Sequence, residues 1–340
     1  MNRIAVALFL ALALPAAALA QDAPAYRIVK TATLGAPDRW DYVVFDPASG
    51  RVYVAHGSEV TAVDGKSGAV LGHVTGLDGG THGIAFARGK VYSDDGKAGI
   101  AASFDPKSFK IIHRIKAEDD ADGIIFDKKS GHIFVIDGDS GKLTVVDPKS
   151  DTPIATIDGG GGLEFGVSGE NGKLYIDGAE KSEIVRIDVK TNKADAHWPL
   201  TGCIRPHGLA IDTKTKRLFA SCANRVMAVM NAESGTVLAD VAIGEGTDFA
   251  MFDAEAGLAF SSNRDGTLSI VQEKSPDEFV ALPPVETAFG ARTMGLDPKN
   301  GRLYLVTAEF DENPSATDAR HRYTIKPGTV KLLFLDPAKR

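Results

Sequence analysis

The chain has 340 residues, of which 45 are acidic and 38 are basic, and its net charge is −7. This acidic balance, without any long run of Lys and Arg, argues against nucleic acid or an anionic membrane surface as a partner. No stretch after residue 20 approaches the roughly 18 apolar residues of a membrane-spanning helix, so no membrane span is predicted.

The first 20 residues have the pattern of a secretory signal peptide. Arg3 supplies a basic start, residues 4–14 an apolar stretch, and residues 18–20 (Ala-Leu-Ala) a small-residue cleavage site. The alternative, a retained N-terminal anchor, is less favoured because the cleavage site is well formed. We therefore expect cleavage after Ala20, a periplasmic or secreted location, and one mature domain over residues 21–340.

From residue 40 onward, one pattern recurs at intervals of about 40 to 44 residues. Each copy contains four short apolar or β-branched runs, separated by turns rich in Gly, Asp, Ser and Lys. Four strands in a repeat of this length are typical of a propeller blade, whereas helix-pair repeats would need longer runs at helical spacing. The seven copies begin with WDYVVFD (40), THGIAFA (81), ADGIIFD (121), GLEFGVS (162), PHGLAID (206), TDFAMFD (247) and ARTMGLD (291).

The strand that completes the last copy is predicted to come from the N-terminus. The seventh copy shows only three strands, and a surplus strand, YRIVKTATL at 26–34, precedes the first copy. Pairing of 26–34 with TVKLLFLD at 329–336 would close the ring and remove two sheet edges. The predicted fold class is all-β, a seven-bladed β-propeller with four antiparallel strands per blade.

The second strands carry a further resemblance. They read YVAH at 53, YSDD at 92, YIDG at 175 and YLVT at 304, and the fifth copy opens with PHGLA at 206. These motifs resemble degenerate YVTN repeats, as in exported YncE-like seven-bladed propellers, over residues 26–336. The resemblance implies the fold more than the activity, because propellers host many functions. The resemblance also implies a third possibility, binding of single-stranded nucleic acid, as suggested for some YncE-like relatives. The negative net charge argues against it.

Polar residues recur at one mouth of the predicted channel. The innermost strand of a blade lines the channel, and its start lies on the same face as the end of the second strand. An inner ring is predicted from Asp41, His82, Asp122, Leu163, His207, Asp248 and Arg292, with Glu164 one position away in the fourth copy. A second ring is predicted from His56, Asp95, Asp137, Gly178, Cys222, Asn263 and Thr307.

Two interpretations of these rings remain open. In the first, the polar groups are hydrogen-bonded and water-bridged and merely finish the channel. In the second, they bind a small polar ligand or a peptide, and the chain is a binding module that we expect to be a monomer. The expected ligand-binding residues are Asp41, His82, Asp122, Glu164, His207, Asp248, Arg292, His56, Asp95, Asp137 and Asn263.

A divalent metal ion is the one cofactor that the pattern suggests. Imidazole and carboxylate together suit zinc or a similar ion. The ion would be held either by Asp41, His82 and Asp122 on consecutive blades or by His207 and Asp248 opposite them, and the expected ligands are His82, Asp122, His207 and Asp248. The alternative function is a metal-dependent hydrolase of the lactonase (gluconolactonase-like) type, with Asp122, Asp248 or Glu164 as the base. Lactone-hydrolysing propellers hold their cation with Glu, Asn and Asp, and the inner ring contains no Asn, which counts against this activity.

Three features lie near the expected mouth. Cys203 and Cys222 flank the first two strands of the fifth copy, which favours a disulfide at the rim over a pair of thiols near His207. Trp40 is expected either to stack on a ligand or to pack between blades one and seven. The insertion at 308–328 is expected to be either disordered or a lid that folds over the mouth, contributed by His321, Arg322 and Tyr323.

Overall fold

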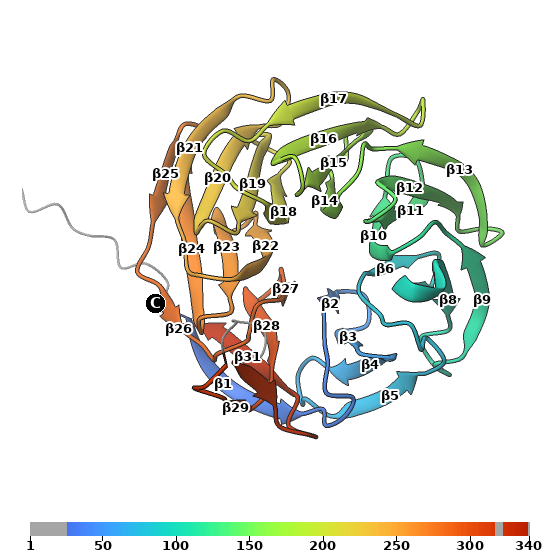
Figure 1. The fold of residues 1–340 in the computed structure, drawn as a ribbon, viewed down its shortest axis with the longest axis vertical. Helices are drawn as coiled ribbons and strands as arrows, with labels where there is room; N and C mark the ends of the chain where they lie inside the picture. The colour runs from blue at the N-terminus through green and yellow to red at the C-terminus, as the bar shows by residue number, and fades with distance from the viewer. Residues whose placement is uncertain (1–25, 317–321, 339–340) are drawn as a thin grey trace, which may run out of the picture.

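The protein is a ring of seven antiparallel sheets around a central channel (Figure 1). The structure is a computed structural model, and it describes residues 26–316 and 322–338. The repeats of the sequence correspond one to one with the blades, and successive strands of each repeat run from the channel outward. The predicted all-β seven-bladed propeller is confirmed. The signal peptide predicted at residues 1–20 lies outside the described residues.

The first four blades contain consecutive strands. Blade 1 comprises β2 (Val43–Asp46), β3 (Arg51–His56), β4 (Glu59–Asp64) and β5 (Val70–Val74). Blade 2 comprises β6 (Ile84–Ala87), β7 (Lys90–Asp95), a 3-10 turn η1 (Gly96–Ala98), β8 (Ile100–Phe104) and β9 (Ile111–Lys116). Blade 3 comprises β10 (Ala121–Asp127), β11 (His132–Asp137), β12 (Lys142–Asp147) and β13 (Thr152–Asp158). Blade 4 comprises β14 (Leu163–Ser168), β15 (Lys173–Gly178), β16 (Glu183–Asp188) and β17 (Lys193–Pro199).

The last three blades contain the departures from the simple pattern. Blade 5 comprises β18 (Pro206–Asp212), β19 (Arg217–Cys222), β20 (Val226–Asn231) and β21 (Val237–Ala242). Blade 6 comprises β22 (Thr247–Asp253), β23 (Leu258–Asn263), β24 (Thr267–Ser275) and β25 (Glu278–Ala281), with β26 (Val285–Glu286) also on β24. Blade 7 comprises β27 (Met294–Asp297), β28 (Arg302–Thr307), β31 (Lys331–Pro337) and β1 (Tyr26–Thr33). The insertion forms a separate hairpin of β29 (Phe310–Glu312) and β30 (Tyr323–Ile325).

Strand β1 closes the ring. It pairs antiparallel with β31, from Tyr26 opposite Pro337 to Thr33 opposite Lys331, so both ends of the described chain lie in blade 7 (Figure 1). Without β1, β31 would be an edge strand with unpaired backbone groups. The predicted closure by the N-terminal strand is confirmed.

The hydrophobic core lies between neighbouring blades. Every blade contributes one aromatic residue from its second strand that is at most 1% exposed, namely Tyr53, Tyr92, Phe134, Tyr175, Phe219, Phe260 and Tyr304. Several of these rings meet an aromatic ring of the adjacent blade, as Tyr53 meets Phe86 and Phe219 meets Phe252. Both faces of each sheet are therefore apolar, which explains why the polar residues gather at the strand ends.

The innermost strands contact one another in a closed circle. The order is β2, β6, β10, β14, β18, β22, β27 and back to β2. Glycine allows the closest of these approaches, because a Cβ atom at Gly83 or Gly208 would collide with the backbone of the next blade, near Ile124 or Ala250. The recurring glycine after the polar residue is thus a packing requirement.

Three aromatic side chains close the channel just below its mouth. Tyr42, Phe165 and Phe249 come from blades 1, 4 and 6, and their ring centroids lie 4.6 to 5.2 Å apart. Since these blades are not neighbours, the three rings meet inside the channel. The mouth above them is therefore a cup and not the entrance of an open pore.

The described residues contain no helix that is long and apolar enough to cross a membrane.

Candidate functional site

Irregular strand starts aim the inner-ring side chains into the mouth. Asp122, His207 and Asp248 lie at register shifts where β10, β18 and β22 begin to pair with the second strand. Such bulges turn a side chain out of the regular alternation of the sheet. In blades 1 and 2 the innermost strand begins to pair with the second strand only at Val43 and Ile84. Asp41 and His82 therefore lie just before their strands.

The fourth blade requires a correction. The alignment placed Leu163 in the inner ring, but Leu163 is 3% exposed and packs in the core with Ile136 and Ile176. The irregular segment of β14 lies between Leu163 and Gly166, and Glu164 extends from it to within 3.4 Å of His207. Glu164 is therefore the inner-ring residue of this blade, and the repeat is displaced by one residue here.

Asp41, His82 and Asp122 form the first group of the mouth, which we call the cation cluster. Each offers one ligand atom, and these atoms lie within 4.8 Å of one another. Nδ1 of His82 lies 3.5 Å from Oδ1 of Asp122. The side chain of His82 is nine-tenths buried, and its Nδ1 has no hydrogen-bond partner.

Asp94 holds the histidine of this cluster in place. Its two carboxylate oxygens accept hydrogen bonds from the backbone N–H groups of His82 and Gly83, at 2.7 and 2.6 Å. Oδ1 of Asp94 also lies 3.3 Å from Nδ1 of His82, and the carboxylate is fully buried. Asp94 therefore holds the backbone at His82, and it pairs with Nδ1, the same imidazole nitrogen that faces Asp122.

The cation cluster is rich in negative charge. Burial, together with the nearby Asp248, raises the pKa of Asp41 to about 7. Burial also raises the pKa of Asp122 well above its usual range, although His82 opposes this shift. For His82, burial lowers the pKa, but Asp94, Asp122 and Asp41 outweigh it and raise the pKa to about 10. Burial is the largest influence on all three groups, and the neighbouring carboxylates raise the pKa of each.

The remaining inner-ring residues form two pairs. His207 faces Glu164 at 3.4 Å, and Arg292 Nε faces Asp248 Oδ2 at 3.2 Å. Hydrogen bonding to Glu164 raises the pKa of His207, while burial raises that of Asp248. Four residues were expected to bind a metal. Two of them, His82 and Asp122, lie together with Asp41 in the cation cluster. The other two are in separate pairs, His207 with Glu164 and Asp248 with Arg292.

The second ring is turned away from the mouth. His56, Asp95, Asp137 and Asn263 are at most 4% exposed. Each bonds within its own blade: His56 Nδ1 to Thr61 at 2.9 Å, Asp137 to the Thr144 hydroxyl at 2.8 Å, and Asn263 Nδ2 to Ser269 at 2.9 Å. Asp95 accepts from the backbone N–H of Ala98. Their partners lie on or before the third strand, so these side chains point along the sheet.

The buried Asp137 leads to a stability prediction. Burial raises its pKa to about 7, and its Oδ1 has no hydrogen-bond partner. A carboxyl whose pKa is higher in the folded than in the unfolded chain costs stability as the pH rises from about 4 through 7. Asp137→Asn should therefore increase the free energy of unfolding at pH 8 by up to about 4 kcal/mol and change it little at pH 4.

Chemical denaturation of both proteins at pH 4, 6 and 8 measures this difference. Asp139→Asn is the matched control, because Asp139 lies in the same turn but is exposed. Equal stability of wild type and Asp137→Asn across the pH range would contradict the prediction.

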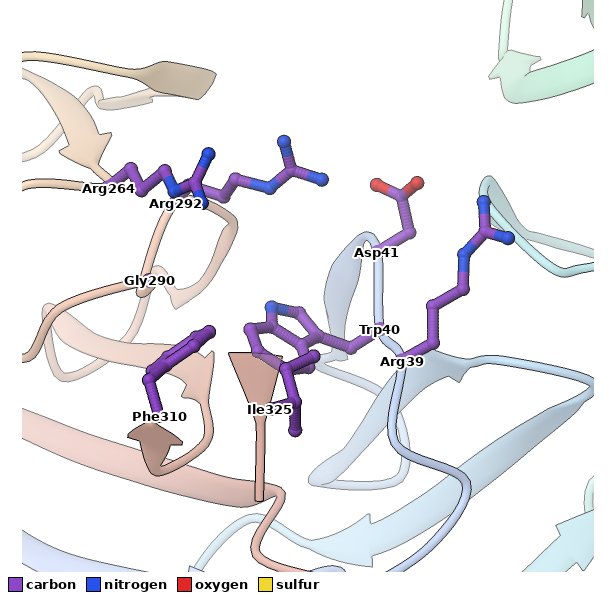
Figure 2. A pocket seen from close by; sticks show the side chains of 8 residues that line it. All are labelled: Arg39, Trp40, Asp41, Arg264, Gly290, Arg292, Phe310 and Ile325. Carbon is purple, nitrogen blue, oxygen red and sulfur yellow. The ribbon is translucent and has the colours of Figure 1, made fainter. Parts of the chain in front are cut away.

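A pocket of about 220 Å³ lies beside the cation cluster, where the ring closes (Figure 2). We call it the arginine pocket. Its lining residues are Arg39, Trp40, Asp41, Arg264, Gly290, Arg292, Phe310 and Ile325. Trp40 also packs in the core between blades 1 and 7, with Val306 and Leu332 among its cluster, as one of the two expectations for this residue states; stacking on a ligand stays a prediction.

The insertion supplies one wall of the arginine pocket. Phe310 and Ile325 belong to the hairpin of β29 and β30, and Phe310 contacts Phe289 at 5.0 Å between ring centroids. Tyr323 packs on Phe289, and Arg322 pairs with Glu312 at 2.9 Å. The described residues of the insertion therefore form a folded hairpin at the edge of the pocket, whereas disorder and a lid were the two expectations. His321, which the lid prediction names, lies outside the described residues.

Cys203 and Cys222 form the disulfide that the sequence favours, with 5.5 Å between their Cα atoms. It joins the segment before β18 to the end of β19, on the side of blade 5 that carries His207. Both cysteines are buried in the blade, against Leu209 and Ala220 among others.

The sequence patterns did not identify several residues of the site. Asp94 had a signal, because only Asp94 and Asp177 place a carboxylate at this position of the second strand, where the other copies have Ala55, Ile136, Ser221, Ser262 and Val306. Tyr42 and Phe249 directly follow Asp41 and Asp248, and Phe165 follows Glu164, at a position where the second, third and fifth copies have glycine. Arg39 and Arg264 lie in connecting segments outside the repeat pattern, so nothing local marks them.

Comparison with known proteins shows the fold alone. A chain in a structure of the mitotic checkpoint complex has a TM-score of 0.74 and 13% identity, with 100% of each chain covered. The structure of U3-55K gives 0.75 and 9%, covering 92% of this chain and 99% of that one. A chain of *Kuenenia stuttgartiensis* hydrazine synthase gives 0.67 and 14%, covering 78% and 91%. No family model and no curated protein matches this sequence.

Fold and site together define the class of protein. The chain is a seven-bladed β-propeller whose channel is closed by aromatic rings beneath a charged mouth. Since identities this low carry no functional information, the activity has to be argued from the site itself.

Proposed function

We propose that this protein is an exported, YncE-like binding module that holds a divalent cation in the cation cluster at the mouth of its channel. The observation that carries the proposal is the buried imidazole of His82, whose Nδ1 lacks a hydrogen-bond partner and lies among carboxylates from two other blades. The pKa of His82 is raised to about 10, so a cation would bind Nδ1 by displacing its proton and would then pair with the carboxylates in place of the imidazolium.

The distances suit a first-row metal ion. Two ligands on a tetrahedral ion with bonds of about 2.1 Å lie about 3.4 Å apart, and His82 Nδ1 and Asp122 Oδ1 are 3.5 Å apart. The third ligand is the carboxylate of Asp41, which has an oxygen within 4.8 Å of both other ligand atoms. One imidazole and two carboxylates favour Zn²⁺ or Mn²⁺ over Ca²⁺ and Mg²⁺, which prefer oxygen alone.

Export is supported by two independent features. The N-terminal sequence has the pattern of a cleaved signal peptide. The disulfide between Cys203 and Cys222 belongs to an oxidising compartment. The YVTN-like repeats support membership of the YncE-like propellers.

A lactonase-type hydrolase fits the site less well. Such enzymes use an asparagine among their metal ligands, and Asn263 is buried and hydrogen-bonded to Thr267 and Ser269 inside blade 6. The binding module is therefore the function that the geometry supports best.

Direct metal binding tests the proposal. Untagged mature protein, stripped with EDTA and dialysed, should bind about one Zn²⁺ or Mn²⁺ per chain in a calorimetric titration. At 100-fold excess over the dissociation constant, binding adds about 2.7 kcal/mol to the free energy of unfolding, which should raise the melting temperature by several degrees. Ca²⁺ and Mg²⁺ are the controls and should bind at least tenfold more weakly. Absence of saturable binding for all four ions at 1 mM would refute the cation site.

A further inference from the structure

The arginine pocket has the opposite charge from the rest of the mouth. Three guanidinium groups line it, those of Arg39, Arg264 and Arg292, against the single carboxylate of Asp41. Arg292 is paired through its Nε to Asp248. Within the described residues, Arg39 and Arg264 form no ion pair, so the pocket keeps a surplus of positive charge even when Asp41 is ionised.

The three arginines that line the pocket come from three parts of the ring. Arg39 precedes β2 of blade 1, Arg264 follows β23 of blade 6, and Arg292 precedes β27 of blade 7. Figure 2 shows Arg264 and Arg292 reaching over the pocket from one side and Arg39 standing on the other side of Asp41. Arginine forks of this kind recognise planar oxyanions, with two parallel hydrogen bonds to one group.

The opposite wall is apolar and rigid. Trp40, Phe310 and Ile325 form it, and the rings of Trp40 and Phe310 meet at 6.3 Å between centroids in an edge-to-face arrangement. Gly290 allows Phe310 to lie this close, because any Cβ at this position of positive φ would collide with the ring. Such a wall provides a surface for a flat apolar group.

A buried donor points to a ligand as well. Trp40 is 8% exposed, and its indole Nε1 has no hydrogen-bond partner. In Figure 2, this nitrogen lies on the edge of the ring that faces Arg292 and Asp41. A buried indole N–H usually finds an acceptor, and an anion held by the arginines would supply one.

We propose that the arginine pocket binds a small aromatic carboxylate. The carboxylate would lie between the guanidinium groups and accept from Trp40 Nε1, while the ring would pack on Phe310 and Ile325. The pocket has a volume of about 220 Å³ and is open to solvent, which leaves room for one aromatic ring with its acid group. The proposal does not depend on the cation site, because none of these contacts requires a metal.

The test uses benzoate as the probe and the mature protein in EDTA. Titration by calorimetry should give saturable binding of benzoate, and acetate should bind at least tenfold more weakly because it lacks the ring. Arg39→Gln and Arg264→Gln should each weaken benzoate binding about tenfold or more, the value of a charged hydrogen bond. Arg205→Gln, an exposed arginine before β18 that does not line the pocket, should leave the affinity within twofold.

Three outcomes would overturn the inference. The first is the absence of saturable binding by benzoate, phenylacetate and 4-hydroxybenzoate, each at 10 mM, to folded protein. The second is benzoate binding that is unchanged in both pocket variants or equally weakened in Arg205→Gln. The third is tighter binding of phenyl phosphate and inorganic phosphate than of benzoate, which would make the pocket a phosphate site instead.

Discussion

Replacement of His82 by alanine is expected to weaken binding of Zn²⁺ or Mn²⁺ at least 100-fold. His82 is the one nitrogen ligand of the cation cluster, and the remaining Asp41 and Asp122 would offer two carboxylates only. Loss of a group that merely supports a metal ligand already costs 10- to 100-fold in affinity, so loss of the ligand itself should cost more. Calorimetric titration of stripped protein measures the change directly.

His207→Ala is the matched control for this experiment. His207 belongs to the same inner ring and also faces a carboxylate, but its partner is Glu164 and it lies outside the cation cluster. It should therefore retain metal affinity within about threefold of wild type. Equal losses in both variants would mean that the mouth attracts cations only through its overall charge, and full affinity in His82→Ala would remove the site from the cation cluster.

Asp94→Asn should have an intermediate effect. Its carboxylate orients His82 through the backbone and approaches the imidazole at 3.3 Å. Loss of this support should weaken metal binding by less than the 100-fold expected for His82→Ala, because Asp94 holds the backbone of His82 but also competes with the ion for Nδ1.

Deletion of β1 is expected to cause the largest loss of stability. The strand contributes a complete ladder to β31 and the side chain of Tyr26, which is 5% exposed and contacts Phe260 at 5.4 Å between centroids. Backbone hydrogen bonds are worth about 1 kcal/mol each, and a buried aromatic side chain adds a few more. Even after the entropy of ordering the strand is subtracted, we expect a loss of about 5 kcal/mol or more.

The deletion also opens the ring to association. Strand β31 would become an edge with free backbone groups, so the truncated protein should aggregate on heating and melt at least 10 °C below wild type. Circular dichroism melts with light scattering measure both effects. Ile28→Ser serves as control because Ile28 is 40% exposed on the same strand and should change stability little. An unchanged melting temperature after the deletion would show that β1 does not hold the ring closed.

The repeat explains why the architecture could be predicted from sequence. Turn residues, apolar runs and the aromatic position of each second strand recur in every copy, and each is a local feature. The missing strand of the seventh copy and the surplus strand at 26–34 then leave a single way to close the ring. The alignment placed the wrong residue of the fourth copy in the inner ring. The irregular segment of β14 between Leu163 and Gly166 puts Glu164 there instead of Leu163.

The candidate site could be predicted only in part. The inner-ring residues were identified because they repeat, and His82 and Asp122 do meet at the mouth. Their grouping with Asp41 was not distinguishable from the grouping of His207 with Asp248, because both sets obey the same spacing. The second ring was expected beside the mouth, but strand pairing turns His56, Asp137 and Asn263 toward the third strands.

The sequence by itself determined the fold class, the number of blades and the closing strand, because these follow from short-range patterns that repeat seven times. The tertiary structure alone decided which charges meet, since contacts between blades depend on register shifts at the strand starts. It also decided that aromatic rings close the channel and that Arg39, Arg264 and Phe310 share a pocket. These residues lie in non-repeating segments, and only closure of the ring brings such distant parts of the chain together.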